Sequence, residues 1–129
     1  MRRLPLPAVS PRLRYVGVAA VAAFIAYYSL ISTPPQAPTT GPLWDKQLHF
    51  LGYAMFGLSV AYATIDRSLG ERVLFVLLCA GLYGVSIELI QGALPARHYG
   101  AGDMLANLLG ATLSLAWLLV ERNVRYVAV

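Results

Sequence analysis

Four apolar stretches constrain most strongly what this chain can fold into, because each is long enough to cross a membrane as a helix. They cover about residues 15–32, 47–65, 73–93 and 104–120. Crossing roughly 30 Å of hydrocarbon takes about 20 mainly apolar residues. Of the 129 residues, 58% are hydrophobic and only 12% are charged, whereas an ordinary soluble domain carries about 25% charged residues. The sequence therefore predicts an all-α, polytopic membrane protein with four transmembrane helices in a compact bundle.

Turn residues separate these stretches. Prolines dominate the first break, between Thr33 and Pro42, and glycine is present in the other two, at residues 66–70 and 94–100. Clusters of proline and glycine are typical of loops between helices. The chain is therefore predicted to have three parts: a basic N-terminus (1–14), a transmembrane domain (15–120) and a tail (121–129).

The distribution of basic residues predicts how the helices are oriented. Of the ten lysines and arginines, eight lie on one side of the predicted membrane and only Lys46 and Arg97 lie on the other. Because Lys and Arg are enriched in cytoplasmic segments, we predict a multi-pass protein of the cell membrane with both termini in the cytoplasm. The eight residues are Arg2, Arg3, Arg12, Arg14, Arg67, Arg72, Arg122 and Arg125.

The basic residues have two alternative interpretations. A cleavable signal peptide also begins with arginines, but the first apolar stretch is long for that role and no small-x-small cleavage site follows it, which favours a retained helix. The net charge of +4 is compatible with nucleic-acid binding. However, the arginines lie at the ends of apolar stretches and form no basic face with interleaved aromatic residues. We therefore predict no nucleic-acid partner.

Polar and ionisable residues lie where membrane helices usually have none. An ionisable group at bilayer depth costs roughly 2.5–3.5 kcal/mol on insertion scales, and intramembrane acids are therefore usually functional. In the predicted topology all of these residues lie at the outer ends of the last three stretches or in the last loop. Together with one tyrosine on the same helix face, they are predicted to form one ligand-binding site: Asp45, Lys46, His49, Tyr53, Glu88, Gln91, Arg97, Asp103 and Asn107.

Helical spacing places most of these residues on three shared faces. Steps of three and four residues join positions on one side of an α-helix. Each face is polar at its outer end and has small residues deeper in the membrane, where small residues let helices approach closely. We therefore expect the faces to pack together around an outward-facing polar site. The faces are Asp45, His49, Gly52, Tyr53 and Phe56; Gly81, Gly84, Glu88 and Gln91; and Asp103, Asn107, Gly110 and Ser114.

Each site residue also has a purely structural interpretation. Glu88 and Gln91 could simply bond neighbouring helices, but such bonds average only about 0.6 kcal/mol in membranes. That gain is smaller than the cost of burying a charged glutamate, which favours a functional role. Arg97 is equally suited to a salt bridge and to forked binding of a phosphate or carboxylate. Asp103 also suits a helix start, and His49 also suits an interfacial position.

A divalent metal is a further interpretation of the acids and the histidine. Asp45, His49, Glu88 and Asp103 offer ligand types that metals accept. The sequence contains neither an HExxH motif nor a close pair of histidines. We therefore predict a site without a metal, and the sequence identifies no cofactor.

The site residues occur in ordered motifs. They read Asp45-Lys46-x-x-His49-Phe50-x-x-Tyr53, then Glu88-x-x-Gln91, then Arg97-x-x-x-x-x-Asp103-x-x-x-Asn107-x-x-Gly110. In this order they resemble the VanZ-like family of small integral membrane proteins, over roughly residues 44–120. The resemblance implies a membrane protein of the cell envelope and a link to antibiotic resistance, namely low-level resistance to the glycopeptide teicoplanin. It implies neither a reaction nor a ligand.

Three functions fit these features. The first is a binding protein whose site holds an anionic lipid headgroup or a cell-envelope precursor, with Lys46 and Arg97 contacting the anion. The second is a membrane-embedded enzyme acting on a lipid-linked phosphate or ester, with Glu88 or Asp103 as catalytic acid or base beside His49. The third is a small accessory subunit that binds a membrane-protein partner. Binding of a lipid or precursor is the function we predict, and whether catalysis accompanies it is left open.

Overall fold

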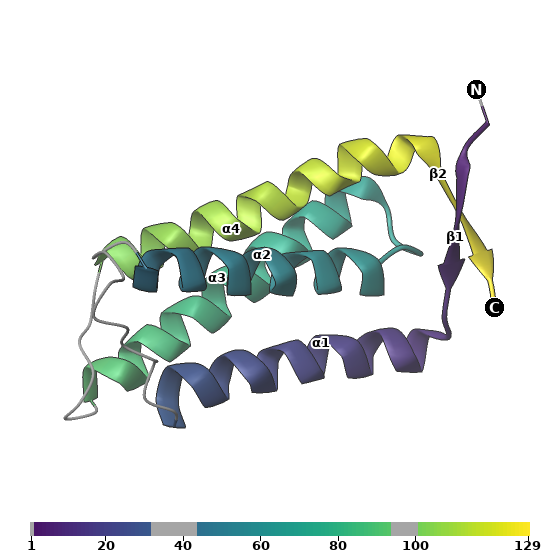
Figure 1. Ribbon diagram of the computed structural model, residues 1–129. Helices are drawn as coiled ribbons and strands as arrows, with labels where there is room; N and C mark the ends of the chain where they lie inside the picture. Colours follow the sequence, from purple (N-terminus) through teal and green to yellow (C-terminus); the bar gives the residue numbers. More distant parts are fainter. Residues whose placement is uncertain (1, 32–43, 94–100) are drawn as a thin grey trace.

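Four α-helices packed side by side form most of the molecule (Figure 1). The computed structural model describes residues 2–31, 44–93 and 101–129, and the side chains of residues 2–31, 47–93 and 104–129. Two strands at the ends of the chain complete the fold. The elements are β1 (Leu4–Ala8), α1 (Pro11–Ala26), the π-helix η1 (Tyr27–Ile31), α2 (Trp44–Ala63), α3 (Leu69–Ala93), α4 (Ala101–Val120), the 3-10 helix η2 (Glu121–Asn123) and β2 (Val124–Ala128).

The predicted helical class is confirmed. Within the described residues, three segments are long and apolar enough to cross a membrane, namely Pro11–Ile31, Leu69–Ala93 and Met104–Asn123. Large apolar side chains cover the outside of the bundle, and Leu82 and Leu89, for example, are 66% and 64% exposed. Helices that are apolar on their outer faces as well as their inner ones are typical of membrane proteins.

Local capping explains why two helices begin before the predicted apolar stretches. At the start of α1 the hydroxyl of Ser10 accepts a hydrogen bond from the backbone N–H of Leu13, and proline occupies the first turn. Ahead of α3, Ser68 and Glu71 each accept a hydrogen bond from the other's backbone N–H, at 3.3 and 3.1 Å. This reciprocal arrangement is a capping box, which satisfies two N–H groups that a helix start leaves unpaired.

Glycines allow α2 and α4 to pack closely. A Cβ atom added at Gly110 would collide with the carbonyl oxygen of Phe50 and come within 3.0 Å of the backbone nitrogen of Ala54. One added at Gly57 would collide with the side chain of Ser114. The α4 side of this contact, with Gly110 and Ser114, belongs to a predicted face, whereas Phe50, Ala54 and Gly57 lie beside the predicted face of α2. This close approach brings the start of α2 beside the start of α4.

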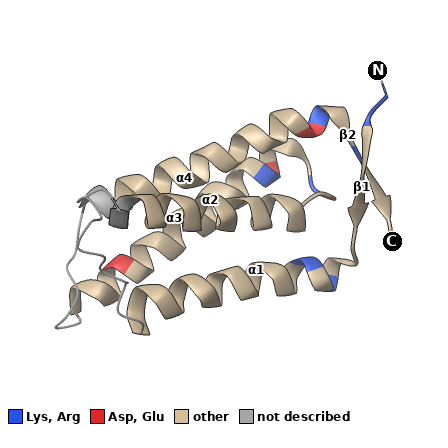
Figure 2. Ribbon diagram, viewed as in Figure 1, with Lys and Arg blue, Asp and Glu red and all other residues tan. Residues whose placement is uncertain are grey.

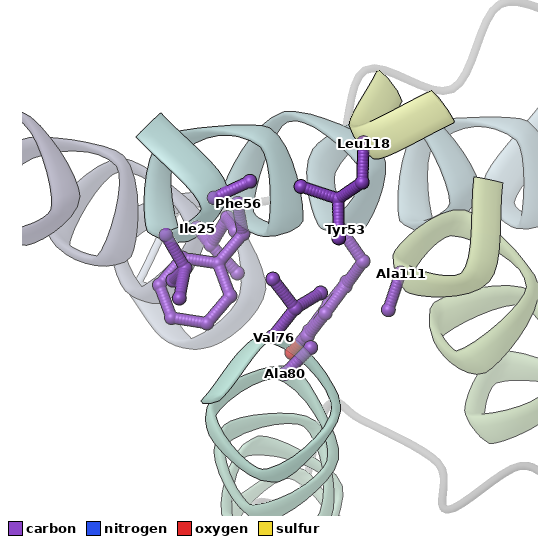
Figure 3. Packing of buried hydrophobic residues seen from close by; sticks show 9 residues of the cluster. Ile25, Tyr53, Phe56, Val76, Ala80, Ala111 and Leu118 are labelled. Atoms are coloured by element: carbon purple, nitrogen blue, oxygen red, sulfur yellow. The ribbon is translucent and has the colours of Figure 1, made fainter. Parts of the chain in front are cut away.

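Apolar side chains from all four helices fill the centre of the bundle. Ile25 of α1, Phe56 of α2, Val76 of α3 and Leu118 of α4 belong to one buried cluster (Figure 3). Tyr53 lies in the same cluster and is only 1% exposed. The apolar core therefore extends directly into the region of the predicted site.

A parallel two-stranded ribbon joins the two ends of the chain, which the sequence did not predict. β1 pairs with β2 from Leu4 opposite Val124 to Ala8 opposite Ala128, and both termini lie at the same end of the bundle (Figure 1). The hydroxyl of Tyr62 at the end of α2 donates to the carbonyl of Pro7 and accepts from the N–H of Val9. We call β1 and β2 together the terminal ribbon.

Two buried arginines fasten this end of the molecule. Arg72 of α3 makes a forked salt bridge to Glu121, with distances of 2.6 and 3.0 Å, and also donates to the carbonyl of Ala61. Arg14 of α1 pairs with Asp66 at 2.8 Å and donates to two backbone carbonyls. Together these contacts connect all four helices at the end that carries the terminal ribbon.

Tyr126 makes the stability of this end depend on pH in the alkaline range. Burial, and then the hydrogen bond that its hydroxyl donates to Glu121, raise the pKa of Tyr126 from 10.0 to about 12. Because the pKa is higher in the folded state, the stability that Tyr126 contributes is complete below pH 10 and is lost as the pH rises toward 12. We expect the unfolding temperature of the parent to fall more steeply over this range than that of Tyr126→Phe. Equal slopes would contradict this expectation.

Candidate functional site

Five of the predicted site residues gather at the end of the bundle opposite the terminal ribbon. His49 and Tyr53 come from the start of α2, Glu88 and Gln91 from the end of α3, and Asn107 from the start of α4. We call these five residues the polar cluster. Four of them are buried, and His49 is partly buried. The helix faces predicted from spacing therefore meet at these positions.

A hydrogen bond joins α2 to α4 within the polar cluster. Nδ1 of His49 lies 3.0 Å from Oδ1 of Asn107. Because an amide oxygen only accepts hydrogen bonds, Nδ1 of His49 carries the proton that this pair shares. Asn107 therefore helps to orient the ring, and it uses only its oxygen to do so.

Two hydrogen-bond donors in the polar cluster have no acceptor among the described residues. They are the hydroxyl of Tyr53 and Nδ2 of Asn107, and both atoms are buried. A buried polar group that is left unpaired costs about 1–3 kcal/mol. The two side chains converge on α3, because Nδ2 of Asn107 and the Tyr53 ring each lie 3.3 Å from the position that a Cβ atom of Gly84 would occupy. Figure 3 shows Tyr53 extending from α2 toward α3.

Glu88 is the ionisable group of the polar cluster that is most deeply buried. It is 0% exposed, and its carboxyl group lies close enough to Tyr53 to interact with it electrostatically. An acid buried at this depth in an apolar bundle is expensive and is usually functional. Glu88 therefore adds a titratable group to the site formed by the two donors.

Gln91 connects the polar cluster to the end of α1. Its Nε2 donates to the carbonyl of Ser29 at 2.8 Å, and Ser29 lies in the π-helix η1. A π-helix leaves carbonyl groups out of the regular α-helical pattern, and such segments occur frequently at functional sites. Gln91 therefore satisfies one of these carbonyls and holds η1 against α3.

Tyr83 is a neighbour of the polar cluster that sequence reasoning missed. Its hydroxyl donates to the carbonyl of Ala22 in α1, and its ring packs against Phe56 and Tyr53, with centroid separations of 5.1 and 6.4 Å. The sequence offered a weak signal, since a tyrosine within a long apolar stretch needs a partner for its hydroxyl. Gly81, by contrast, was predicted to face the site, but a Cβ atom there would meet nothing within 4 Å.

The other predicted site residues lie outside what the structure describes. Arg97 lies between the described segments, and the side chains of Asp45, Lys46 and Asp103 are also not described. Their assignment to the site remains a prediction. Among the described residues, no group of three or more histidine, cysteine or acidic side chains is placed to hold a metal ion.

Comparisons with known proteins identify one relative of unknown function. An uncharacterized protein of Schizosaccharomyces pombe is 33% identical over 75 residues, which are 57% of this chain and 46% of the relative. The chain therefore matches less than half the length of that relative. No protein family matches the sequence, and no solved structure matches it.

Proposed function

We propose that this protein is an integral membrane protein whose polar cluster binds the anionic headgroup of a membrane lipid or of a lipid-linked envelope precursor. The two ligands share the relevant chemistry, which is a phosphate group carried on an apolar tail. The proposal includes four membrane-spanning helices, both termini in the cytoplasm and the polar cluster on the outer side. It also includes membership of the VanZ-like family and, with it, the link to teicoplanin resistance.

One observation carries this proposal. The hydroxyl of Tyr53 and Nδ2 of Asn107 are buried donors that converge near Gly84 and have no acceptor among the described residues. Both groups can donate a hydrogen bond, and phosphate oxygens are strong acceptors. An anionic oxygen placed between them would satisfy both donors.

Two further features are compatible with this proposal. Gly84 lets both donor side chains lie against α3, since a Cβ atom there would lie only 3.3 Å from Nδ2 of Asn107. Membrane phospholipids occur in all cells, so a headgroup of this class is compatible with a relative in Schizosaccharomyces pombe. Lys46 and Arg97 would supply the positive charge that the anion requires.

Replacing Tyr53 by Phe tests this proposal. Because its hydroxyl has no hydrogen-bond partner among the described residues, its removal should leave the stability of the ligand-free protein unchanged or slightly higher. The same change should weaken headgroup binding about tenfold or more, since a hydrogen bond to a charged group contributes about 1.5–3 kcal/mol. Native mass spectrometry of the full chain would measure lipid retention, and thermal unfolding in detergent would measure stability.

Matched probes and a matched variant make this experiment decisive. Phosphatidylglycerol and a polyprenyl phosphate distinguish a lipid headgroup from an envelope precursor, and phosphatidylcholine is the uncharged control. Tyr27→Phe is the control variant, because Tyr27 is 49% exposed at the same end of the bundle. If Tyr53→Phe is clearly less stable than the parent but retains lipid equally well, the hydroxyl serves packing and the proposal is wrong.

The enzyme and accessory-subunit alternatives give different results in the same experiment. Loss of phosphate from the polyprenyl probe would indicate an enzyme, and a Glu88→Gln, Asp103→Asn double variant would then have to lose that activity. Retention of neither anionic lipid would favour the accessory subunit. A binding protein should retain an anionic lipid unchanged, and less of it as the salt concentration rises.

A further inference from the structure

The end of the bundle that carries the terminal ribbon has an excess of positive charge that the fold does not use. Arginine positions gather there in Figure 2. Six of these arginines are exposed at the surface. They are Arg2, Arg3, Arg12, Arg67, Arg122 and Arg125.

The acidic side chains at this end mostly pair with groups other than the exposed arginines. Asp66 pairs with the buried Arg14, and Glu121 pairs with the buried Arg72. Glu71, which is exposed, accepts a hydrogen bond from the backbone of Ser68 in the cap of α3. Within the described part of the chain, these three carboxylates leave most of the exposed arginines without a neutralising charge.

The terminal ribbon holds part of this charge in a fixed place. β2 carries Arg125 and is paired along its length with β1. β1 is in turn held against α2 by both hydrogen bonds of the Tyr62 hydroxyl. Arg122 lies in η2, between α4 and β2. These two arginines are therefore organised by the fold, unlike the charges of a flexible tail.

The exposed arginines lie next to the ends of the helices, where the lipid headgroups of a membrane would be. Arg12 is in the first turn of α1, Arg67 lies between α2 and α3, and Arg122 directly follows α4. Exposed apolar side chains accompany them, including Leu13 at 60% exposure and Val127 at 43%. A surface that combines basic and apolar side chains at helix ends suits an anionic bilayer surface.

We propose that the terminal ribbon and the adjoining helix ends form a second lipid-binding surface, which holds anionic phospholipids of the leaflet next to the chain termini. This surface is distinct from the polar cluster, which lies at the opposite end of the bundle. The proposal rests on insertion in a membrane but not on headgroup binding by the polar cluster.

The fluorescence of Trp117 can report on this surface separately from the polar cluster. The sequence contains two tryptophans, and Trp44→Phe leaves only Trp117, which is partly buried on α4 and lies close to Tyr126 of the terminal ribbon. The full chain would be reconstituted in phosphatidylcholine vesicles. Quenching of Trp117 by brominated phosphatidylglycerol would then be compared with quenching by brominated phosphatidylcholine at equal mole fraction.

We expect stronger quenching of Trp117 by the anionic lipid, with a preference that falls as salt rises. Arg122→Gln combined with Arg125→Gln should weaken the preference about fivefold for each arginine replaced. Asn123→Gln is the control, because Asn123 is exposed and uncharged between them, and it should leave the preference unchanged.

Three outcomes would overturn the proposal. The first is equal quenching by the two lipids in the Trp44→Phe protein. The second is an anionic preference that survives in the double arginine variant but disappears in Tyr53→Phe, which would assign the lipid to the polar cluster. The third is displacement of the lipid by a polyglutamate peptide whose carboxylates are less concentrated than the lipid phosphates. That result would assign the surface to an acidic protein partner.

Discussion

Glu121→Gln is expected to lower the free energy of unfolding by about 3–5 kcal/mol, the usual effect of removing one partner of a buried ion pair. The side chains of Arg72 and Glu121 are only 9% and 7% exposed. The neutral glutamine would leave Arg72 buried without its opposite charge. Equilibrium unfolding of the full chain in detergent would measure the loss.

Two further variants separate the charge of Arg72 from its packing. Arg72→Met combined with Glu121→Leu removes both charges and should recover most of the stability, because apolar residues often replace a buried ion pair without loss. Glu71→Gln alters an exposed acid near the same end and should cost less than about 1 kcal/mol. If Glu121→Gln is no less stable than Glu71→Gln, the forked salt bridge does not hold this end together.

Gly110→Ala is expected to destabilise the bundle by about 1–3 kcal/mol or more, because overpacking forces neighbouring groups apart. The added methyl group would meet backbone atoms of Phe50 and Ala54, which cannot move away without shifting α2. Separation of α2 from α4 would also lengthen the 3.0 Å contact between His49 and Asn107. We therefore expect Gly110→Ala to lose headgroup binding as well as stability.

Gly81→Ala is the matched control for this variant. A Cβ atom at Gly81 would meet nothing within 4 Å, and alanine is the better helix former by about 1 kcal/mol. The control should therefore be at least as stable as the parent. Equal stability of the two alanine variants would show that α2 and α4 do not pack as closely as described.

Helical periodicity made the buried faces predictable from the sequence. Tyr53, Glu88 and Asn107 lie at positions that steps of three and four residues join to small residues, and the structure buries all three. Spacing along one helix gives no information about neighbouring helices, however. The pairing of His49 with Asn107, which are 58 residues apart, therefore required the structure.

The terminal ribbon was not predictable for a different reason. β1 contains Pro5 and Pro7, and proline within a short segment usually argues against a strand. In the ribbon, Ala8 accepts a hydrogen bond from Val129, so alternate residues of β1 face β2 and both prolines fall on the opposite edge. An edge position is where a strand tolerates proline, and the pairing partner lies at the other end of the chain.

The buried arginines show a similar limit. Arg14 and Arg72 entered the topology prediction as two of many positive charges, and nothing in their local sequence distinguishes them. Their partners Asp66 and Glu121 are 52 and 49 residues away. Pairing over such separations depends on how the helices pack, so composition and spacing could not separate structural arginines from exposed ones.

We expect Nδ2 of Asn107 to donate a hydrogen bond to the phosphate of a bound lipid. Solid-state NMR would test it directly by measuring dipolar coupling between ³¹P of the lipid and asparagine side-chain ¹⁵N. The sequence contains one other asparagine, Asn123, so Asn123→Gln leaves Asn107 as the only labelled amide. We predict coupling at hydrogen-bonding distance with phosphatidylglycerol or polyprenyl phosphate, and its loss in Asn107→Leu. Bound lipid without such coupling would show that Asn107 does not contact the phosphate.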